Sequence, residues 1–198
     1  MTAAIVSAAV RLSALVWIVG ASSGCLVLSL NPAYDDSTIA WEPALVGAWQ
    51  SPDDKSSIRI ERGEWQSYRL HYEHPIETGD LTGYLTIVGN DRYLDVMPAR
   101  GKDHGSFLIP AHAVLRVRLE GDNLELTPLS YDWFADRLKA AQPIVGLNAT
   151  LDQKENALIV SASGQLRDWL RSQTPASAAL GAPATFIRRP VKADADKK

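Results

Sequence analysis

The chain has 198 residues, 46% hydrophobic and 22% charged, a composition that supports one globular domain with a sizeable core. Its formal net charge of −3 excludes the strongly basic surface that nucleic-acid-binding proteins use, so we expect no nucleic-acid partner. A single cysteine excludes an internal disulfide and any metal site made of several thiolates.

The N-terminal segment has the pattern of an export signal. Arg11 is its only charged residue, and the apolar run 12–21 and the small residues Ser22, Ser23 and Gly24 follow it. A soluble core helix would need a polar face, which this run lacks. We therefore predict a signal peptide over residues 1–24.

The four residues Ser22-Ser23-Gly24-Cys25 resemble the lipobox of bacterial lipoproteins. In that family the signal is cut before the cysteine, which then carries acyl chains, so the resemblance implies lipidation of Cys25. Leu26 stands where the family's inner-membrane retention signal has Asp, which implies an outer-membrane location facing the periplasm. Two alternatives stay open: an uncleaved membrane helix over residues 12–30 and a conventionally cleaved, secreted protein.

Residues 25–42 contain the turn pairs Asn31-Pro32 and Asp35-Asp36, and Pro43 follows, which is typical of a tether. Tyr34, Ile39 and Trp41 could nevertheless pack on the domain. We predict the folded domain over residues 43–189 and a disordered, solvated tail over 190–198.

Alternating apolar and polar residues predict six or seven short strands in the domain. Turn signals such as Arg62-Gly63 and Gly121-Asp122-Asn123 separate neighbouring runs. The fold class expected is mainly β with two helices (α+β), an antiparallel meander that forms a barrel or half-barrel. The alternating apolar positions are Ile58, Ile60, Tyr68, Leu70, Tyr72, Leu85, Ile87, Leu94, Val96, Leu115, Val117, Leu119, Leu124 and Leu126.

Two helices are predicted in the C-terminal half. Ser130 can cap the first, which ends before Gln142-Pro143, and the second runs over about 164–173. Residues 157–160 are predicted to form a strand between them, and Phe186 and Ile187 a last edge strand.

The stretch Gly47-Ala48-Trp49 resembles the Gly-x-Trp entry of lipocalin and calycin barrels. In that superfamily the tryptophan closes the barrel floor and a late arginine packs over it, which implies a pair of Trp49 with Arg188 or Arg189. Residues 43–140 also resemble small bacterial lipoproteins of unassigned activity. This resemblance implies a β-rich domain outside the cytoplasm and no catalytic residues.

The histidines offer little chemistry. His71 and Glu73 share one face of a strand, but two ligands are too few for zinc, so no metal is expected. Asp103 and His104 lie in a glycine-rich loop, and His112 opens a strand in a structural or surface position. The sequence lacks the motifs of phosphate loops, serine elbows and metalloprotease helices, so no cofactor is expected.

These patterns favour a membrane-anchored binding module of the cell envelope that takes a small apolar ligand or an envelope protein. Trp49, Tyr68, Tyr72 and Tyr84 are aromatic residues that could line a ligand site, although each could instead fill the core. A second hypothesis, from another class, is an envelope hydrolase with a loop-borne site near His104.

Overall fold

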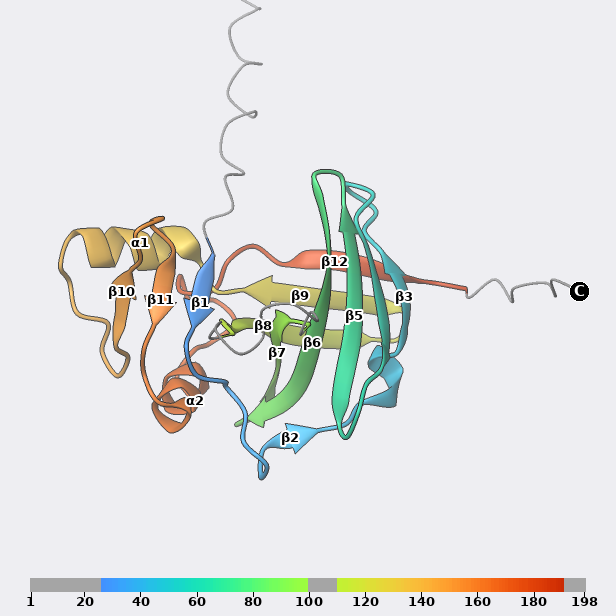
Figure 1. Ribbon diagram of the computed structural model, residues 1–198, viewed down its shortest axis with the longest axis horizontal. Coiled ribbons are helices and arrows are strands. Elements are labelled where there is room, and N and C mark those ends of the chain that lie inside the picture. Colours follow the sequence, from blue (N-terminus) through green and yellow to red (C-terminus); the bar gives the residue numbers. More distant parts are fainter. Residues whose placement is uncertain (1–25, 100–109, 191–198) are drawn as a thin grey trace, which may run out of the picture.

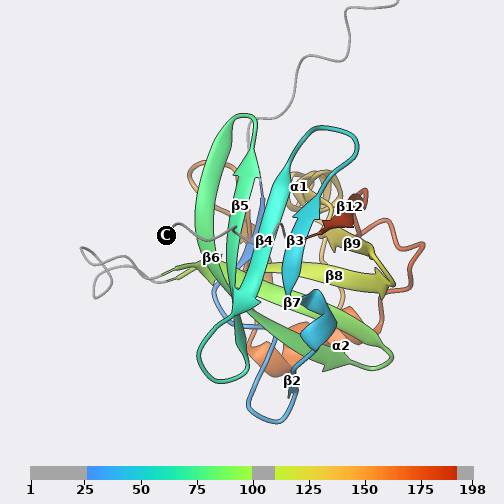
Figure 2. The same ribbon diagram turned by 90° about the vertical axis from the view of Figure 1, so that its right-hand side faces the viewer.

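A computed structural model of the chain describes residues 26–99 and 110–190 (Figure 1). The predicted fold class is confirmed: the structure is mainly β with two helices, and an eight-stranded antiparallel barrel closes, consistent with a lipocalin/calycin-like barrel. In Figure 2, β3 to β6 stand upright in front while β7 and β8 run across the molecule at a steep angle to them. The barrel strands are β3 (Gly47–Gln50), β4 (Ser57–Arg62), β5 (Ser67–His74), β6 (Glu77–Val88), β7 (Asp91–Pro98), β8 (Ala113–Glu120), β9 (Asn123–Pro128) and β12 (Ala184–Arg189).

Closure of the barrel depends on its last strand. β12 pairs with β9 on one side and with β3 on the other, and β6 pairs with both β5 and β7. The prediction that Phe186 and Ile187 form an edge strand was therefore wrong, because both sides of β12 are hydrogen-bonded. Closure leaves none of these eight strands with an open edge.

Apolar side chains fill the barrel interior. The alternation seen in the sequence points one face of each strand inward, and the inward residues form one buried cluster. Its fully buried large members are Trp49, Tyr68, Leu45, Ile60, Leu85, Leu94 and Leu124.

An outer layer covers one side of the barrel (Figure 1, left). It consists of a three-stranded sheet and two helices, and it shares a second buried cluster with the outward-facing Val88, Tyr93 and Val114 of the barrel wall. Among the described residues, no helix is long and apolar enough to cross a membrane. The elements are β1 (Val27–Ser29), β10 (Ala149–Leu151), β11 (Ala157–Ile159), α1 (Tyr131–Lys139) and α2 (Ser163–Arg171).

The helices and β11 lie where the sequence predicts them. The Ser130 hydroxyl accepts a hydrogen bond from the Trp133 amide at 3.3 Å and so caps α1. Trp169 of α2 packs edge-on against Phe134 of α1, with ring centroids 5.6 Å apart. The bulky apolar faces of both helices therefore meet each other in the outer core.

The segment 26–42, predicted as a tether, is part of the fold. β1 pairs in parallel with β11, β2 (Ile39–Ala40) pairs with β6, and a 3-10 helix, η1 (Pro43–Leu45), follows. Ala33, which lies between β1 and β2 in the chain, is fully buried. The turns in this segment thus redirect the chain as it passes over the barrel surface. The prediction of a tether does not hold for residues 26–42.

Candidate functional site

Trp49 of β3 and Arg188 of β12 are cross-strand partners whose side chains pack against each other. The guanidinium carbon of Arg188 lies 4.1 Å from the centroid of the Trp49 ring, and Nη1 donates to the Val46 carbonyl at 2.9 Å. Gly47 has φ +154°, and a Cβ there would come within 2.5 Å of the same guanidinium. The glycine of the Gly-x-Trp motif therefore makes room for the arginine that covers the tryptophan.

The aromatic residues expected to line a ligand site have different positions. Trp49 and Tyr68 are buried in the barrel core, and the Tyr68 hydroxyl accepts from the Glu42 amide at 2.7 Å. Desolvation raises the pKa of Tyr68. Tyr72 is half-buried and lies over Gly79, its cross-strand partner. Tyr84 lines an open pocket on the outer wall of the barrel.

A buried Asp95–His112 pair joins the barrel wall to the outer layer. Asp95 Oδ1 lies 2.6 Å from His112 Nδ1, and Oδ2 accepts from the Ala33 amide at 2.6 Å. The two side chains are only 1% and 6% exposed. Residues 29 and 112 also exchange two backbone hydrogen bonds of 2.8 Å. The carboxylate thus fixes the N-terminal segment and β8 at one point.

Above this pair lies a pocket of about 430 Å³ that we call the aromatic cleft, lined by Tyr34, Asp36, Ile39, Trp65, Gln66 and Tyr84. The rings of Tyr34 and Tyr84 lie 4.4 Å apart, and Tyr34 meets the His112 ring edge-on at 6.4 Å. Burial, with the nearby charge of Asp95, raises the pKa of Tyr34 to about 12. Tyr34 therefore stays neutral at physiological pH and offers an apolar ring face with one hydroxyl.

Trp65 forms the outer wall of the aromatic cleft. It is 90% exposed and adopts φ 58°, a backbone conformation that bulky residues rarely take. The turn around it is fixed, because the Ser67 amide and hydroxyl both donate to the Glu64 carbonyl, at 3.0 and 2.6 Å. A large apolar ring is therefore exposed to water on a hydrogen-bonded turn at the edge of the aromatic cleft.

The predicted pair His71 and Glu73 lies on the exposed outer face of β5. His71 Nε2 is 3.7 Å from Glu73, and Nδ1 is 2.8 Å from Asp80. The hydrogen bond to Asp80 raises the pKa of His71. Within the described ranges no group of three or more His, Cys, Asp or Glu side chains could hold a metal ion. Neither His71 nor Glu73 lines the pocket that contains Tyr84.

Cys25, Asp103 and His104 lie outside the described residues. The sequence analysis missed the Asp95–His112 pair and Trp65. For the first, the signal was a charged residue within the apolar run Tyr93-Leu94-Asp95-Val96; for the second, it was a tryptophan placed in a turn.

Comparison with known proteins gives no relative: no family model, no curated protein and no solved structure matches this chain.

Proposed function

We propose that this protein is a lipid-anchored binding module of the bacterial cell envelope. Lipidated Cys25 would attach it to the outer membrane, and the aromatic cleft would bind an envelope protein on the periplasmic side. The observation that supports binding most directly is Trp65, 90% exposed at the edge of that cleft.

A protein partner fits the geometry better than a ligand enclosed by the barrel. The inward residues of the barrel are buried against one another, so the interior is filled by its own side chains. The aromatic cleft instead combines the rings of Tyr34, Tyr84 and Trp65 with a polar rim of Asp36 and Gln66. Tryptophan and tyrosine dominate the centres of protein interfaces, and polar residues surround them.

The fold also favours a lipid anchor over an uncleaved membrane helix. The uncharged run 12–30 could span a bilayer only as a continuous helix, but β1 takes residues 27–29 into a sheet. Residues 12–26 would form a helix of about 22 Å, at about 1.5 Å per residue. The hydrocarbon core is about 30 Å thick. Acyl chains on Cys25 supply the membrane affinity that this shortened run lacks.

The proposal is tested in living cells with a photo-crosslinking amino acid at position 65. We expect one crosslinked product of defined mass. The control is the same amino acid at Ile76, which is 72% exposed at the turn between β5 and β6. The same products at both positions would contradict a specific cleft, and so would an apolar small molecule that the delipidated domain retains in native mass spectrometry.

The anchor is tested separately. Mass spectrometry of the mature N-terminal peptide should show a modified Cys25 as the first residue, and Cys25→Ser should move the protein from the membrane to the soluble fraction. An intact segment 1–24 would refute the anchor and leave the cleft hypothesis standing.

A further inference from the structure

The chain enters the fold directly after Cys25. The Leu26 amide lies 3.4 Å from Asn156 Oδ1, and Val27 already pairs with Ala157. Because one residue spans at most about 3.5 Å, residue 25 lies within about 7 Å of Val27. A lipid attached there is therefore held close to the three-stranded sheet.

The two faces of this sheet differ. On one face, Val27, Ser29 and Ile159 are buried in the outer core. The opposite face presents apolar residues, because the parallel register places Leu28 beside Leu158 and the alternation continues outward along both strands. We call this set the apolar strip; it comprises Leu26, Leu28, Leu30, Leu158 and Val160.

The apolar strip is open to solvent. Leu26 is 53% exposed, Leu30 38% and Val160 42%, and the two others are half-buried. Leu30 and Val160 lie near each other, since the Leu30 amide donates to the Ile159 carbonyl at 2.9 Å. Neighbouring exposed apolar side chains mark an interaction surface.

We infer that the apolar strip lies against the bilayer in which the acyl chains of Cys25 insert. This inference rests on the proposed lipidation, and the short connection to β1 is its main argument. Because no free tether separates the lipid from the sheet, the surface beside residue 26, which is the apolar strip, would be the first to reach the boundary between headgroups and acyl chains. Leucine and valine side chains are suited to that boundary.

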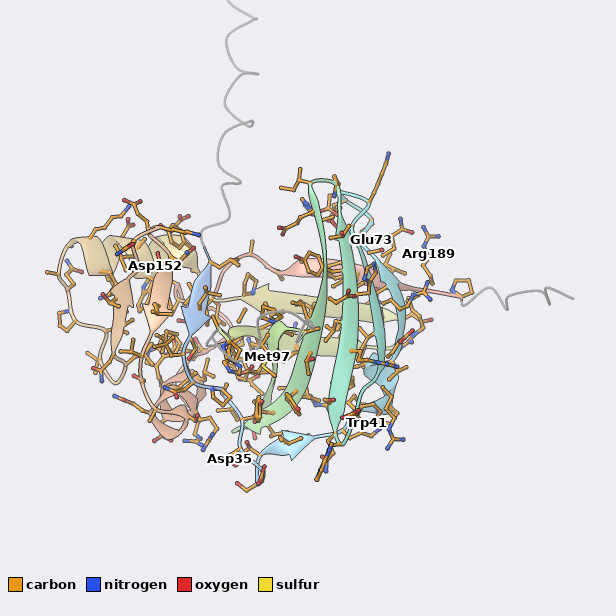
Figure 3. All side chains as sticks on the ribbon, viewed as in Figure 1. Asp35, Trp41, Glu73, Met97, Asp152 and Arg189 are labelled. Carbon is orange, nitrogen blue, oxygen red and sulfur yellow. The ribbon has the colours of Figure 1, made fainter. Side chains whose placement is uncertain are left out.

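The position of the aromatic cleft agrees with this orientation. In Figure 1 the chain enters β1 at the upper end of that strand, whereas β2, which contains the cleft residue Ile39, lies at the lower end of the molecule. Figure 3 places Asp35, next to the cleft residues Tyr34 and Asp36, at the same lower end. The apolar strip and the aromatic cleft share no residue, so contact of the strip with the bilayer would leave the cleft residues open to a partner in the periplasm.

The experiment uses the full, lipidated protein in phosphatidylethanolamine–phosphatidylglycerol vesicles. A nitroxide is attached to Val160→Cys, and the matched control is Ile187→Cys, because Ile187 is 44% exposed on the barrel strand β12. Collision with an aqueous nickel chelate should fall severalfold at position 160 on vesicles and stay unchanged at position 187. Leu30→Cys should behave like Val160→Cys and serves as a second position if one variant folds poorly.

The number of nitroxides per chain distinguishes failure of the proposed lipid anchor from failure of the inferred bilayer contact. A thioether at Cys25 leaves no free thiol, so each lipidated variant takes one nitroxide. Two nitroxides per chain would mean that Cys25 is unmodified, and both the anchor and the inference would fail. One nitroxide with equal nickel access at positions 160 and 187 would overturn the bilayer contact alone.

Discussion

The barrel and the outer layer bury their apolar side chains in different ways. The barrel core comes from residues that alternate along hairpins, such as Leu70 and Leu85 on the adjacent strands β5 and β6. The outer core joins segments far apart in the chain, such as Val27 with Ala157. Most barrel strands pair with their neighbours in the chain, and only the pairings of β12 with β3 and β9 join distant segments. The outer layer instead depends on long-range contacts, such as the hydrogen bond from the Ala33 amide to Asp95, which also binds His112.

The largest expected effect is removal of the Asp95–His112 pair. Asp95→Ala leaves the His112 ring and the Ala33 amide buried without their acceptor. A buried donor left without its acceptor costs about 1–3 kcal/mol, so we expect the loss of the acceptor of both donors to lower the free energy of unfolding by about 2–6 kcal/mol. Urea denaturation followed by circular dichroism measures it.

The chain supplies a matched control in Asp80→Ala, which breaks the exposed pair of His71 with Asp80. The free energy of unfolding of this variant should stay unchanged within error, because exposed pairs are screened by solvent. Hydrogen exchange adds a spatial test: in Asp95→Ala the backbone amide of Ser29 should exchange faster while amides in β5 keep their protection. Equal stability of the two variants would show that the pair does not hold the layers together.

The same contrast explains what the sequence could predict. The strands, the capped helix at Ser130 and the barrel class follow from local patterns, because alternation and capping involve residues close in the chain. The outer layer depends on pairings such as Leu28 with Leu158, which no local pattern encodes, so residues 26–42 resembled a tether. The aromatic cleft was missed for the same reason, since it joins Tyr34, Trp65 and Tyr84 from three separate segments.

A smaller effect is expected where Arg188 packs against Trp49. Arg188→Ala removes the guanidinium over Trp49 and its hydrogen bond to Val46, and we expect a loss of about 1–2 kcal/mol in the free energy of unfolding. Arg189→Ala is the control, because the side chain of that exposed arginine bonds, among the described residues, only to the Gln50 side chain. We expect its effect to stay within about 0.5 kcal/mol. Similar losses in both variants would argue against a stabilising role of the contact between Arg188 and Trp49.

The smallest effect concerns the pKa of His71 on the outer barrel wall. The hydrogen bond that His71 donates to the Asp80 carboxylate is the main cause of the raised pKa, so Asp80→Asn should lower the pKa of His71 toward the usual value near 6.5. A raised folded-state pKa gives stability that is fully present below the unfolded pKa and lost as the pH rises through the folded one. Asp80→Asn should therefore remove a small stabilisation seen only on the acidic side.

NMR titration of the His71 ring measures the shift directly, and a pKa that stays the same in Asp80→Asn would assign its cause to Glu73 instead. No hydrogen bond or ion pair described above joins His71 or Asp80 to the outer layer. The NMR signals of β1 should therefore stay unchanged during the titration of His71, whereas Asp95→Ala should change them.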